Sequence, residues 1–351
     1  MPHDTPSAST PEFASLEAVF SRLDPDRSLI LTDEILEGIC SASLGQLRRL
    51  IVPRGEAAKT WGSLRRLFAG MSSVGVDRGW TLYALGGGSV SDLGGFAAST
   101  WMRGIGFAAL PTTLLSMVDA SLGGKNGIDF YGSKNLIGTF RIPDRIVCDL
   151  SLLAFLDPVQ FASGMAEAVK HAIIGGEAYF SLLESCLEKG RGPEGFSHLR
   201  LDHESLRSLV EGSQRIKLDI VGRDPREAGE RRILNLGHSF GHGIEMATGI
   251  PHGHAVSLGI TFACALSRRK GLMDADTEAR LLGLLRGFGL PTDPWVLREP
   301  AVRKKVVASL GGDKKRYGDS LHFVLPEAPG KVEVIPLLLS DLRAFFEEEL
   351  G

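Results

Sequence analysis

The chain has 351 residues, of which 43% are hydrophobic and 23% are charged, and its formal net charge is −3. This length favours two domains, and the near-neutral charge excludes a global field that would attract nucleic acid or a membrane surface. We therefore expect no nucleic-acid or membrane partner, and we expect any anionic ligand to be captured by a local cluster of cations.

The cysteines and the N-terminus indicate a cytoplasmic protein. The four cysteines, at positions 40, 148, 186 and 264, are far apart and form no CxxC pair, which is typical of thiols in a reducing compartment. No apolar run is long enough to span a membrane. Residues 1–14 are polar and lack the apolar core of a signal peptide, so we expect them to form a disordered tail.

The first half alternates short apolar runs with helical patterns. Strands are expected at 28–32, 49–52, 80–85, 107–110 and 145–149, with helices between them. One of these helices is expected to begin at Pro111. This alternation predicts a Rossmann-like α/β domain, in which a parallel sheet carries helices on both faces.

A glycine turn at 86–88 follows the run at 80–85. We expect Ser89 to cap the next helix, with Asp92 completing a capping box. A strand, a glycine turn and a helix start together present backbone N–H groups to an anion such as a dinucleotide pyrophosphate. Ser91 stands where the common dinucleotide fingerprint has Gly or Ala, so the turn alone is equally compatible with a structural role. Lys125 and Lys134 are expected on flexible loops that follow.

The second half is predicted to be mostly α-helical. Helical periodicity covers 158–174, 178–189, 204–221, 232–248, 255–270, 276–288 and 302–310. Two late apolar runs, 321–325 and 332–336, are expected to form a small hairpin.

Metal-type residues gather in this half. Glu167 is predicted to share a helix face with Lys170, and His238 lies four residues before His242. One carboxylate, two imidazoles and an open position suit catalytic zinc. A histidine pair at this spacing is more often a packing feature, but two further histidines, at 252 and 254, follow directly and favour a metal site.

Glycines and cations accompany these residues. Gly237 and Gly241 each cost roughly 1 kcal/mol relative to Ala inside a helix, which suggests that something approaches the backbone closely there. Any single lysine is most simply a solvated surface group. As a set, the cations would suit a substrate with anions at two ends; they are Lys125, Lys134, Lys170, Lys217, Arg231, Lys314 and Lys315.

Eight motifs make the chain resemble the 3-dehydroquinate synthase family of sugar phosphate cyclases, from about residue 30 to near the C-terminus. They are GGGSVSD at 86–92, RG at 103–104, PTTLLSMVDASLGGK at 111–125, GSKNLIGTF at 132–140, ASGMAEAVK at 162–170, LNLGHSFGHGIE at 234–245, HGHAV at 252–256 and DKK at 313–315.

The resemblance implies an NAD-binding domain over 15–150 and a helical metal- and substrate-binding domain over 151–351, with the active site in the cleft between them. It implies zinc or cobalt held by Glu167, His238 and His252. The NAD contacts that it implies are Glu56, Lys59, Gly87, Gly88, Ser89, Val90, Ser91, Asp92, Thr112, Thr113, Asp119, Lys125 and Lys134. The implied substrate contacts are Lys125, Asn135, Lys170, Lys217, Arg231, Asn235, His242 and one of Lys314 or Lys315. Arg103 is implied to reach the phosphate site of a neighbouring subunit, and hence a homodimer.

The implied activity is a lyase reaction of the shikimate pathway. A small anionic sugar phosphate, 3-deoxy-D-arabino-heptulosonate 7-phosphate, would become 3-dehydroquinate and phosphate. The steps are transient oxidation by NAD, elimination of phosphate, reduction and an intramolecular aldol closure. The chain departs from the family at His254, where an acidic residue is usual, and at Ala154 and Phe155, where Lys-Thr is usual.

Three alternatives remain open. Another sugar phosphate cyclase, of the 2-deoxy-scyllo-inosose or epi-valiolone synthase type, would match less well at Arg231, Asn235 and His242. A metal-dependent polyol dehydrogenase would lack the two-ended set of cations and would accumulate NADH. A non-catalytic NAD-binding descendant would have lost a ligand or an anion-binding lysine, and the sequence shows no such loss.

Overall fold

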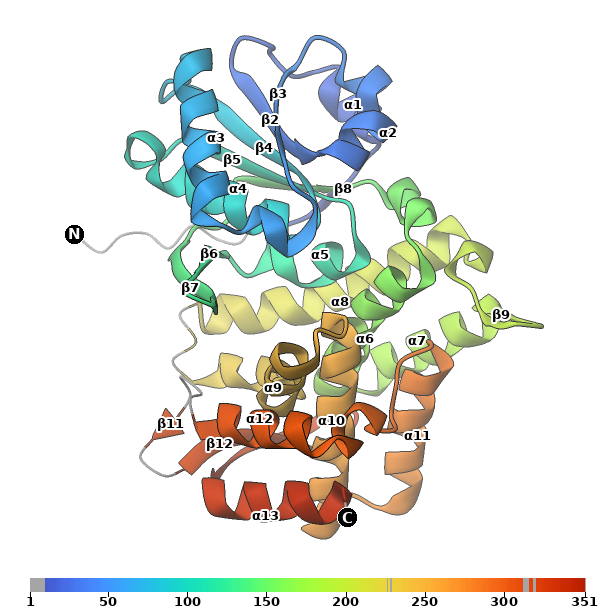
Figure 1. The fold of residues 1–351 in the computed structure, drawn as a ribbon. Helices are drawn as coiled ribbons and strands as arrows, with labels where there is room; N and C mark the ends of the chain where they lie inside the picture. The colour runs from blue at the N-terminus through green and yellow to red at the C-terminus, as the bar shows by residue number, and fades with distance from the viewer. Residues whose placement is uncertain (1–9, 226, 228, 312–315, 318–319, 351) are drawn as a thin grey trace. The chain divides into compact units, whose positions relative to one another are not determined.

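The computed structural model describes residues 10–225, 227, 229–311, 316–317 and 320–350. The chain divides into two compact units, Met1–Leu156 and Asp157–Gly351 (Figure 1). We expected the division after residue 150. The 3₁₀ helix η4 (Leu150–Phe155) belongs instead to the first unit, because Leu152 is part of a core cluster of that unit.

A six-stranded parallel sheet forms the centre of the first unit, with the order β1-β8-β5-β4-β2-β3. Its strands are β1 (Glu12–Phe13), β2 (Ser28–Asp33), β3 (Arg48–Val52), β4 (Thr81–Gly86), β5 (Gly106–Pro111) and β8 (Arg145–Cys148). The predicted parallel α/β domain is therefore confirmed. The expected tail over 1–14 is wrong at Glu12 and Phe13, which pair with β8. Residues 1–9 lie outside the described residues.

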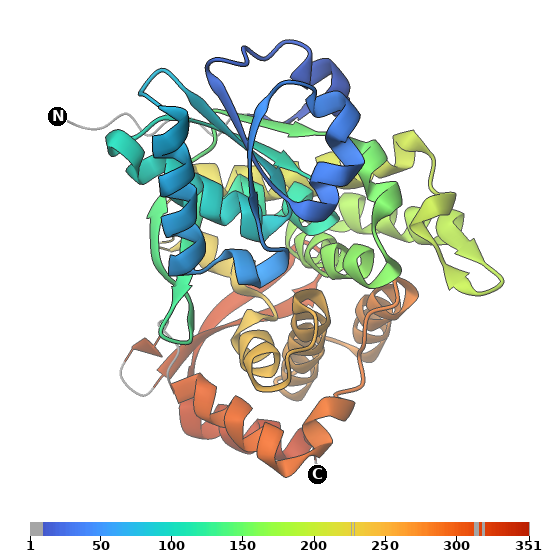
Figure 2. The same cartoon turned by 45° about the horizontal axis from the view of Figure 1, so that its top comes forward.

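Helices cover both faces of this sheet, as Figure 2 shows. They are α1 (Leu16–Phe20), α2 (Glu34–Leu44), α3 (Trp61–Val74), α4 (Gly88–Thr100) and α5 (Leu114–Val118). Side chains alternate along β2, so Leu29 and Leu31 join a core cluster with residues of α3 and α4, while Ile30 joins one with residues of α1 and α2. This alternation buries both faces, which is why the strands read as continuous apolar runs.

Two expected helix starts are wrong. Helix α4 begins at Gly88, and its N-cap is Gly87, which has no side chain to cap the helix; Ser89 lies inside the helix, and the Asp92 carboxylate pairs with Lys59. Pro111 is the last residue of β5. Helix α5 begins at Leu114, and its N-cap is Thr113, whose side chain accepts a hydrogen bond from the N–H of Ser116.

The expected loops around Lys125 and Lys134 are also wrong, because they form an antiparallel hairpin. Its strands are β6 (Lys125–Phe130) and β7 (Ser133–Phe140), and it packs against α4. Gly127 and Gly138 face each other across the pair, where a methyl group on either would collide with the opposite backbone. These glycines and the charged residues conceal the alternation that normally reveals a strand.

The second unit is mostly helical, as expected. Its helices are α6 (Pro158–Gly175), α7 (Glu177–Gly190), α8 (His203–Arg223), α9 (His238–Thr248), α10 (His252–Arg269), α11 (Ala275–Gly287), α12 (Pro300–Gly311) and α13 (Leu339–Leu350). The predicted late hairpin is confirmed as β12 (Ser320–Ala328) and β13 (Lys331–Leu338), with β11 (Arg316–Tyr317) beside β12. A short hairpin joins β9 (Arg191–Gly192) to β10 (Gly195–Phe196).

One predicted helix of this unit is two elements. Residues 232–248 divide into the 3₁₀ helix η6 (Glu230–Asn235) and α9, because Gly237 has a left-handed backbone with φ of 78°. Phe240 of α9 then packs against Phe262, Phe323 and Phe346, which anchors the helix in the core of the unit.

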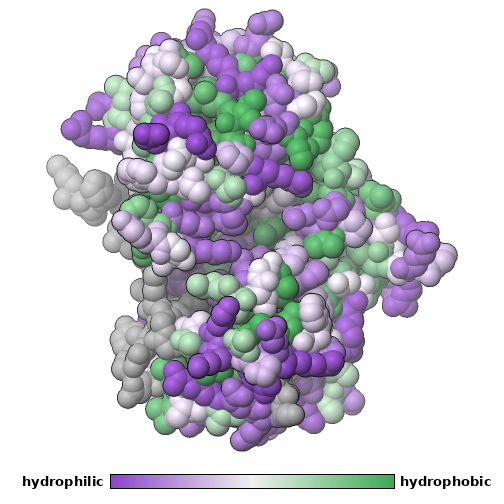
Figure 3. Space-filling model, in the orientation of Figure 1, coloured by the Kyte–Doolittle hydropathy of each residue, from purple (hydrophilic) through white to green (hydrophobic). Residues whose placement is uncertain are grey.

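The surface in Figure 3 intersperses hydrophilic and hydrophobic residues over each unit. Among the described helices, none is both long enough and apolar enough to cross a membrane.

Candidate functional site

Three helices of the second unit bring Glu167, His238 and His252 together. One ligand atom from each lies within 4.8 Å of the others. Oε1 of Glu167 is 3.3 Å from Nε2 of His252 and 3.5 Å from Nε2 of His238. A carboxylate and two imidazoles at these separations form a donor set suited to a divalent ion such as zinc or cobalt.

Close packing of helix backbones places these side chains. A methyl group on Gly237 or Gly241 would crowd the backbone of α10, and one on Gly259 of α10 would collide with the carbonyl of Gly237. Gly253 approaches Ser163 of α6 in the same way. The glycines beside the histidines therefore admit a neighbouring helix, which is the close approach that their cost in the sequence suggested.

In each histidine, Nδ1 is the outer nitrogen, the one that does not face Glu167, and it has a partner within the protein. Nδ1 of His238 is 3.1 Å from the carbonyl oxygen of Leu236, and Nδ1 of His252 is 3.0 Å from Oε2 of Glu245. Such contacts orient an imidazole so that Nε2 faces a metal. Glu245 was not among the residues predicted from the sequence, although it lies seven residues after His238, on the same face of α9.

The pKa values of the two histidines shift in opposite directions. Burial lowers the pKa of His238 well below its usual value. Burial also disfavours charge on His252, but its hydrogen bonds to Glu167 and Glu245, together with their negative charges, raise its pKa to about 10. An ion that binds at His252 therefore has to displace a proton.

A buried cation adjoins the carboxylate. Lys170, one turn beyond Glu167 on α6, contacts Oε2 of Glu167, and the two side chains are 2% and 0% exposed. Lys217 of α8 and Arg231 of η6 are also buried, and η6 packs against both α6 and α8. The second unit thus holds several cations away from bulk water, where they would bind an anion strongly.

The other predicted substrate residues of this unit have mixed surroundings. Arg231 donates to the carbonyl oxygen of Pro225 at 2.8 Å, and Asn235 donates to Oε1 of Glu227 at 2.7 Å. His242 is exposed, with its ring 5.1 Å from that of His238. Lys314 and Lys315 lie outside the described residues.

The glycine turn lies at the carboxyl edge of the sheet in the first unit. Thr112, just after β5, donates its N–H to the carbonyl oxygen of Gly86 at 3.0 Å, and Gly87 packs against the side chain of Thr113. The order β3-β2-β4-β5-β8 changes direction between β2 and β4, and ligands of such sheets bind at that edge. The structure thus gathers the predicted turn and both threonines at one edge.

The start of α4 defines which backbone groups can meet an anion. The N–H groups of Val90 and Ser91 donate to the carbonyl oxygen of Gly87, both at 3.1 Å, and both side chains are buried. Gly88 and Ser89 come before these two donors. Theirs are therefore the backbone N–H groups that point out of the N-terminus of α4, where an anion could bind. Asp119 follows α5 and is half-buried.

Lys59 is the centre of a second polar cluster. Lys59 is 3% exposed. Its Nζ lies 2.7 Å from Oδ2 of Asp92 and 3.8 Å from Oε2 of Glu56, and it donates a hydrogen bond to Oδ1 of Asn135. Burial disfavours its charge, but the charges of Asp92 and Glu56 outweigh burial and raise its pKa. The predicted cofactor residue Lys59 and the predicted substrate residue Asn135 are therefore bonded to each other.

Asp129 holds this arrangement in place. Its N–H donates to the carbonyl oxygen of Lys59 at 2.8 Å, and its carboxylate accepts from the N–H of Asn135 at 2.8 Å. Asn135 has a left-handed backbone with φ of 51°. Asp129 carries no signal in the sequence, since no local pattern reveals a bond to a residue 70 positions away.

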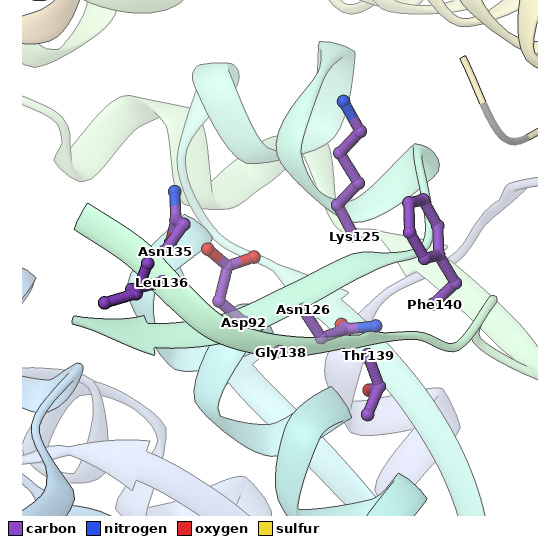
Figure 4. A pocket seen from close by; sticks show the side chains of 8 residues that line it. All are labelled: Asp92, Lys125, Asn126, Asn135, Leu136, Gly138, Thr139 and Phe140. Carbon is purple, nitrogen blue, oxygen red and sulfur yellow. The ribbon is translucent and has the colours of Figure 1, made fainter. Parts of the chain in front are cut away.

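A pocket of about 280 Å³ opens beside this cluster. Figure 4 shows Asp92 from α4 next to Asn135 from β7, with the chain of Lys125 extending from β6. Its lining residues are Asp92, Lys125, Asn126, Asn135, Leu136, Gly138, Thr139 and Phe140. Lys134 is exposed on the same hairpin, and Arg103 is exposed on η2 (Trp101–Arg103).

Comparison with known proteins assigns the family. The family described as 3-dehydroquinate synthase N-terminal matches residues 49–163, and the one described as 3-dehydroquinate synthase C-terminal matches residues 164–316. The chain belongs to the 3-dehydroquinate synthase family. A 3-dehydroquinate synthase of Prochlorococcus marinus (strain MIT 9515) is 40% identical over 287 residues, which cover 81% of this chain and 76% of the relative.

A second member of the family matches most of the chain, and a solved structure shares its fold. A 3-dehydroquinate synthase of Halorhodospira halophila is 37% identical over 316 residues, covering 88% of this chain and 86% of the relative. A 2-epi-5-epi-valiolone synthase from Streptomyces hygroscopicus, solved with NAD+ and Zn2+ bound, has a TM-score of 0.84 at 24% identity, covering 97% of this chain and 95% of that one. This structural likeness supports the fold.

Proposed function

We propose that this protein is an NAD- and metal-dependent lyase that converts 3-deoxy-D-arabino-heptulosonate 7-phosphate to 3-dehydroquinate and phosphate. Membership of the 3-dehydroquinate synthase family supports the reaction. The observation that carries the proposal is the Glu167, His238 and His252 cluster, with Lys170 against the carboxylate. A cation beside a metal-type donor set suits an anionic substrate whose carbinol carbon is oxidised to a ketone.

The donor set fits a divalent ion. Both imidazoles direct Nε2 toward the Glu167 carboxylate while their other nitrogens are held by Leu236 and Glu245. When bound, such an ion would act as a Lewis acid on the carbinol oxygen of the substrate. Two solved structures of similar fold hold NAD+, one together with Co2+ and the other with Zn2+.

The side chains of this protein would bind and orient the substrate. Lys170, Lys217 and Arg231 are buried cations that can hold its carboxylate and phosphate groups. Lys125 lines the hairpin pocket, and Asn235 and His242 offer hydrogen bonds. We keep Lys314 and Lys315 as alternative contacts. Fixing one substrate through oxidation, elimination, reduction and ring closure supplies much of the rate enhancement.

NAD would occupy the carboxyl edge of the sheet. The turn at 86–88 and the start of α4 would receive the pyrophosphate, with Thr112 and Thr113 beside it. Lys59, Glu56, Asp92 and Asp119 would contact the rest of the cofactor. Because the hydride returns to the substrate in each turnover, NAD would not be consumed.

Arg103 supports an assembly of two copies. Arg103 is exposed, and both it and Met102 have left-handed backbones, with φ of 67° and 49°. Non-glycine residues rarely adopt this conformation, and such strain concentrates at functional sites. We propose that Arg103 contacts the phosphate bound by a second copy in a homodimer.

The four cysteines are buried free thiols, which suits the reducing cytoplasm.

The decisive assay follows two products together. Purified protein with Co2+ and NAD equimolar to the sugar should release phosphate from the heptulosonate phosphate, with no lasting rise in absorbance at the NADH wavelength. Stoichiometric NADH without phosphate would identify a polyol dehydrogenase. Phosphate release from glucose 6-phosphate alone would identify a cyclase of the 2-deoxy-scyllo-inosose type, and no reaction with either sugar would overturn the proposed reaction.

Subunit mixing tests the homodimer. Arg103→Ala and Lys170→Ala should each be inactive alone. Hybrid dimers, made by mixing and refolding the two, should regain activity because one site has both wild-type residues. Equal inactivity of the hybrids, with dimers confirmed by light scattering, would place Arg103 in its own subunit's site.

A further inference from the structure

A buried histidine adjoins the metal-type cluster without belonging to it. His171 lies one turn beyond Glu167 on α6 and is 0% exposed. A ring nitrogen of His171 and a carboxylate oxygen of Glu167 lie within 4.8 Å of each other. Residues four apart on a helix share a face, so the imidazole and the carboxylate emerge from α6 side by side.

The His171 ring is fixed from a second helix. Its Nδ1 lies 2.7 Å from Oγ of Ser213, which is on α8 and is also 0% exposed. A hydrogen bond between two fully buried groups is costly to lose, because neither can turn to water instead. The bond therefore sets the rotation of the imidazole beside Glu167.

Close packing prevents α8 from sliding. A methyl group on Gly212 would overlap the ring of Tyr179, and one on Gly175 of α6 would overlap the side chain of Ile216. The hydroxyl of Tyr179, on α7, donates to the carbonyl oxygen of Leu209 at 2.6 Å, one turn before Ser213. The position of Ser213 relative to α6 is thus held from two sides.

We propose that His171 and Ser213 form a positioning pair that orients the Glu167 carboxylate for metal binding. Oε1 of Glu167 faces the two histidines, while Oε2 contacts Lys170. A carboxylate with different partners on its two oxygens must be held against rotation, and the tied imidazole supplies a fixed neighbour. The inference rests on the proposed function, since it assumes that Glu167 binds a divalent ion.

Metal affinity provides the test. Co2+ is titrated into the metal-free protein in competition with a chromogenic chelator, and the ligand-field absorption of the Co2+ complex is recorded. Ser213→Ala should weaken Co2+ binding about tenfold and change the ligand-field spectrum, since outer partners of metal ligands typically contribute about 10- to 100-fold in affinity. Ser213→Thr, which keeps a hydroxyl, should restore most of the affinity.

A matched control separates positioning from packing. Ser257 is also 0% exposed, and its hydroxyl donates to the carbonyl oxygen of Pro291 at 2.7 Å. Ser257→Ala removes an equivalent buried bond, so it should lower thermal stability like Ser213→Ala but leave Co2+ affinity unchanged. His171→Asn keeps a polar group within reach of Ser213 but lacks the far ring nitrogen, and it should bind Co2+ more weakly.

The outcomes are distinct. Wild-type Co2+ affinity in both Ser213→Ala and His171→Asn would overturn the inference and leave the proposed function standing. A higher KM for the sugar phosphate with unchanged Co2+ affinity would also overturn it, because the pair would then serve Lys217, one turn further along α8. Failure of the wild-type protein to bind Co2+ would overturn the inference and the metal-dependent function together.

Discussion

The two polar clusters, one in each unit, use the same chemical pair in different ways. In the second unit, Lys170 contacts Glu167 one turn away on a single long helix, and the carboxylate is 0% exposed. In the first unit, Lys59 pairs with Asp92 across 33 residues of sequence and also donates to Asn135 of the hairpin, 76 residues away. The Lys170–Glu167 pair thus lies within one helix, whereas the contacts of Lys59 join three separate elements.

This difference separates a preformed site from one whose groups satisfy each other. Around Glu167, the ligand nitrogens already face one carboxylate, and their outer nitrogens are held elsewhere. Around Lys59, the ammonium group is already engaged by Asp92 and Asn135, so a ligand that uses either side chain must exchange one bond for another. We therefore expect damage to the first cluster to abolish activity and damage to the second to weaken ligand binding.

The largest effect should come from the preformed cluster. Removing the metal with a chelator, or changing His238→Ala, should lower turnover at least about a thousandfold, because a metal Lewis acid contributes several kcal/mol to the transition state. Added Zn2+ or Co2+ should restore the chelated wild-type protein but not the variant. His203→Ala, at an exposed histidine on α8, should remain active. Metal-free protein with more than a tenth of full activity would contradict the metal assignment.

Lys59→Met tests the second cluster. It should weaken NAD binding about 10- to 100-fold in calorimetric titration, because hydrogen bonds from a charged group contribute roughly 1.5–3 kcal/mol. The metal affinity of the second unit should not change. Lys189→Met removes another lysine hydrogen bond, to Ser205 of the second unit, and should leave NAD affinity intact. Unchanged NAD binding in Lys59→Met would remove Lys59 from the cofactor site.

Glu245→Gln tests how strongly the outer contacts matter in the preformed cluster. The amide can still contact Nδ1 of His252 but carries no charge, so Zn2+ affinity should fall about tenfold. The measurement is competition with a chelator. Glu184→Gln, which loses only a surface contact with Arg280, is the control. Equal Zn2+ affinities in the two variants would show that Glu245 does not support His252.

The smallest effect concerns the backbone at Asn135. Asn135→Ala should destabilise the first unit by about 1 kcal/mol more than Asn135→Gly, because alanine tolerates the left-handed backbone at φ of 51° less well than glycine. Both variants lose the bond to Lys59, so their difference isolates the backbone cost. Denaturant unfolding measures it, and equal stability would show that residue 135 adopts another conformation in solution.

The units differ in how far local patterns predicted them. The parallel sheet followed from short apolar runs that alternate with helices, and most helices of the second unit followed from periodicity over ten or more residues. The predictions of strands and helices failed where a glycine or a charged residue interrupted or concealed the hydrophobic pattern. The hairpin at 125–140 was missed for this reason, and the break at Gly237 was hidden inside a continuous helical pattern.

The sequence by itself determined most strands of the parallel sheet, most helices of the second unit, the glycine turn and the family, because these depend on residues close together along the chain. Only the tertiary structure decided that Lys59 bonds to Asn135, that Glu245 holds His252 and that His171 is tied to Ser213. Periodicity reports which face of an element is buried. Which polar groups meet across distant elements depends on how closely the backbones pack, and here glycines such as Gly212 and Gly259 set that distance.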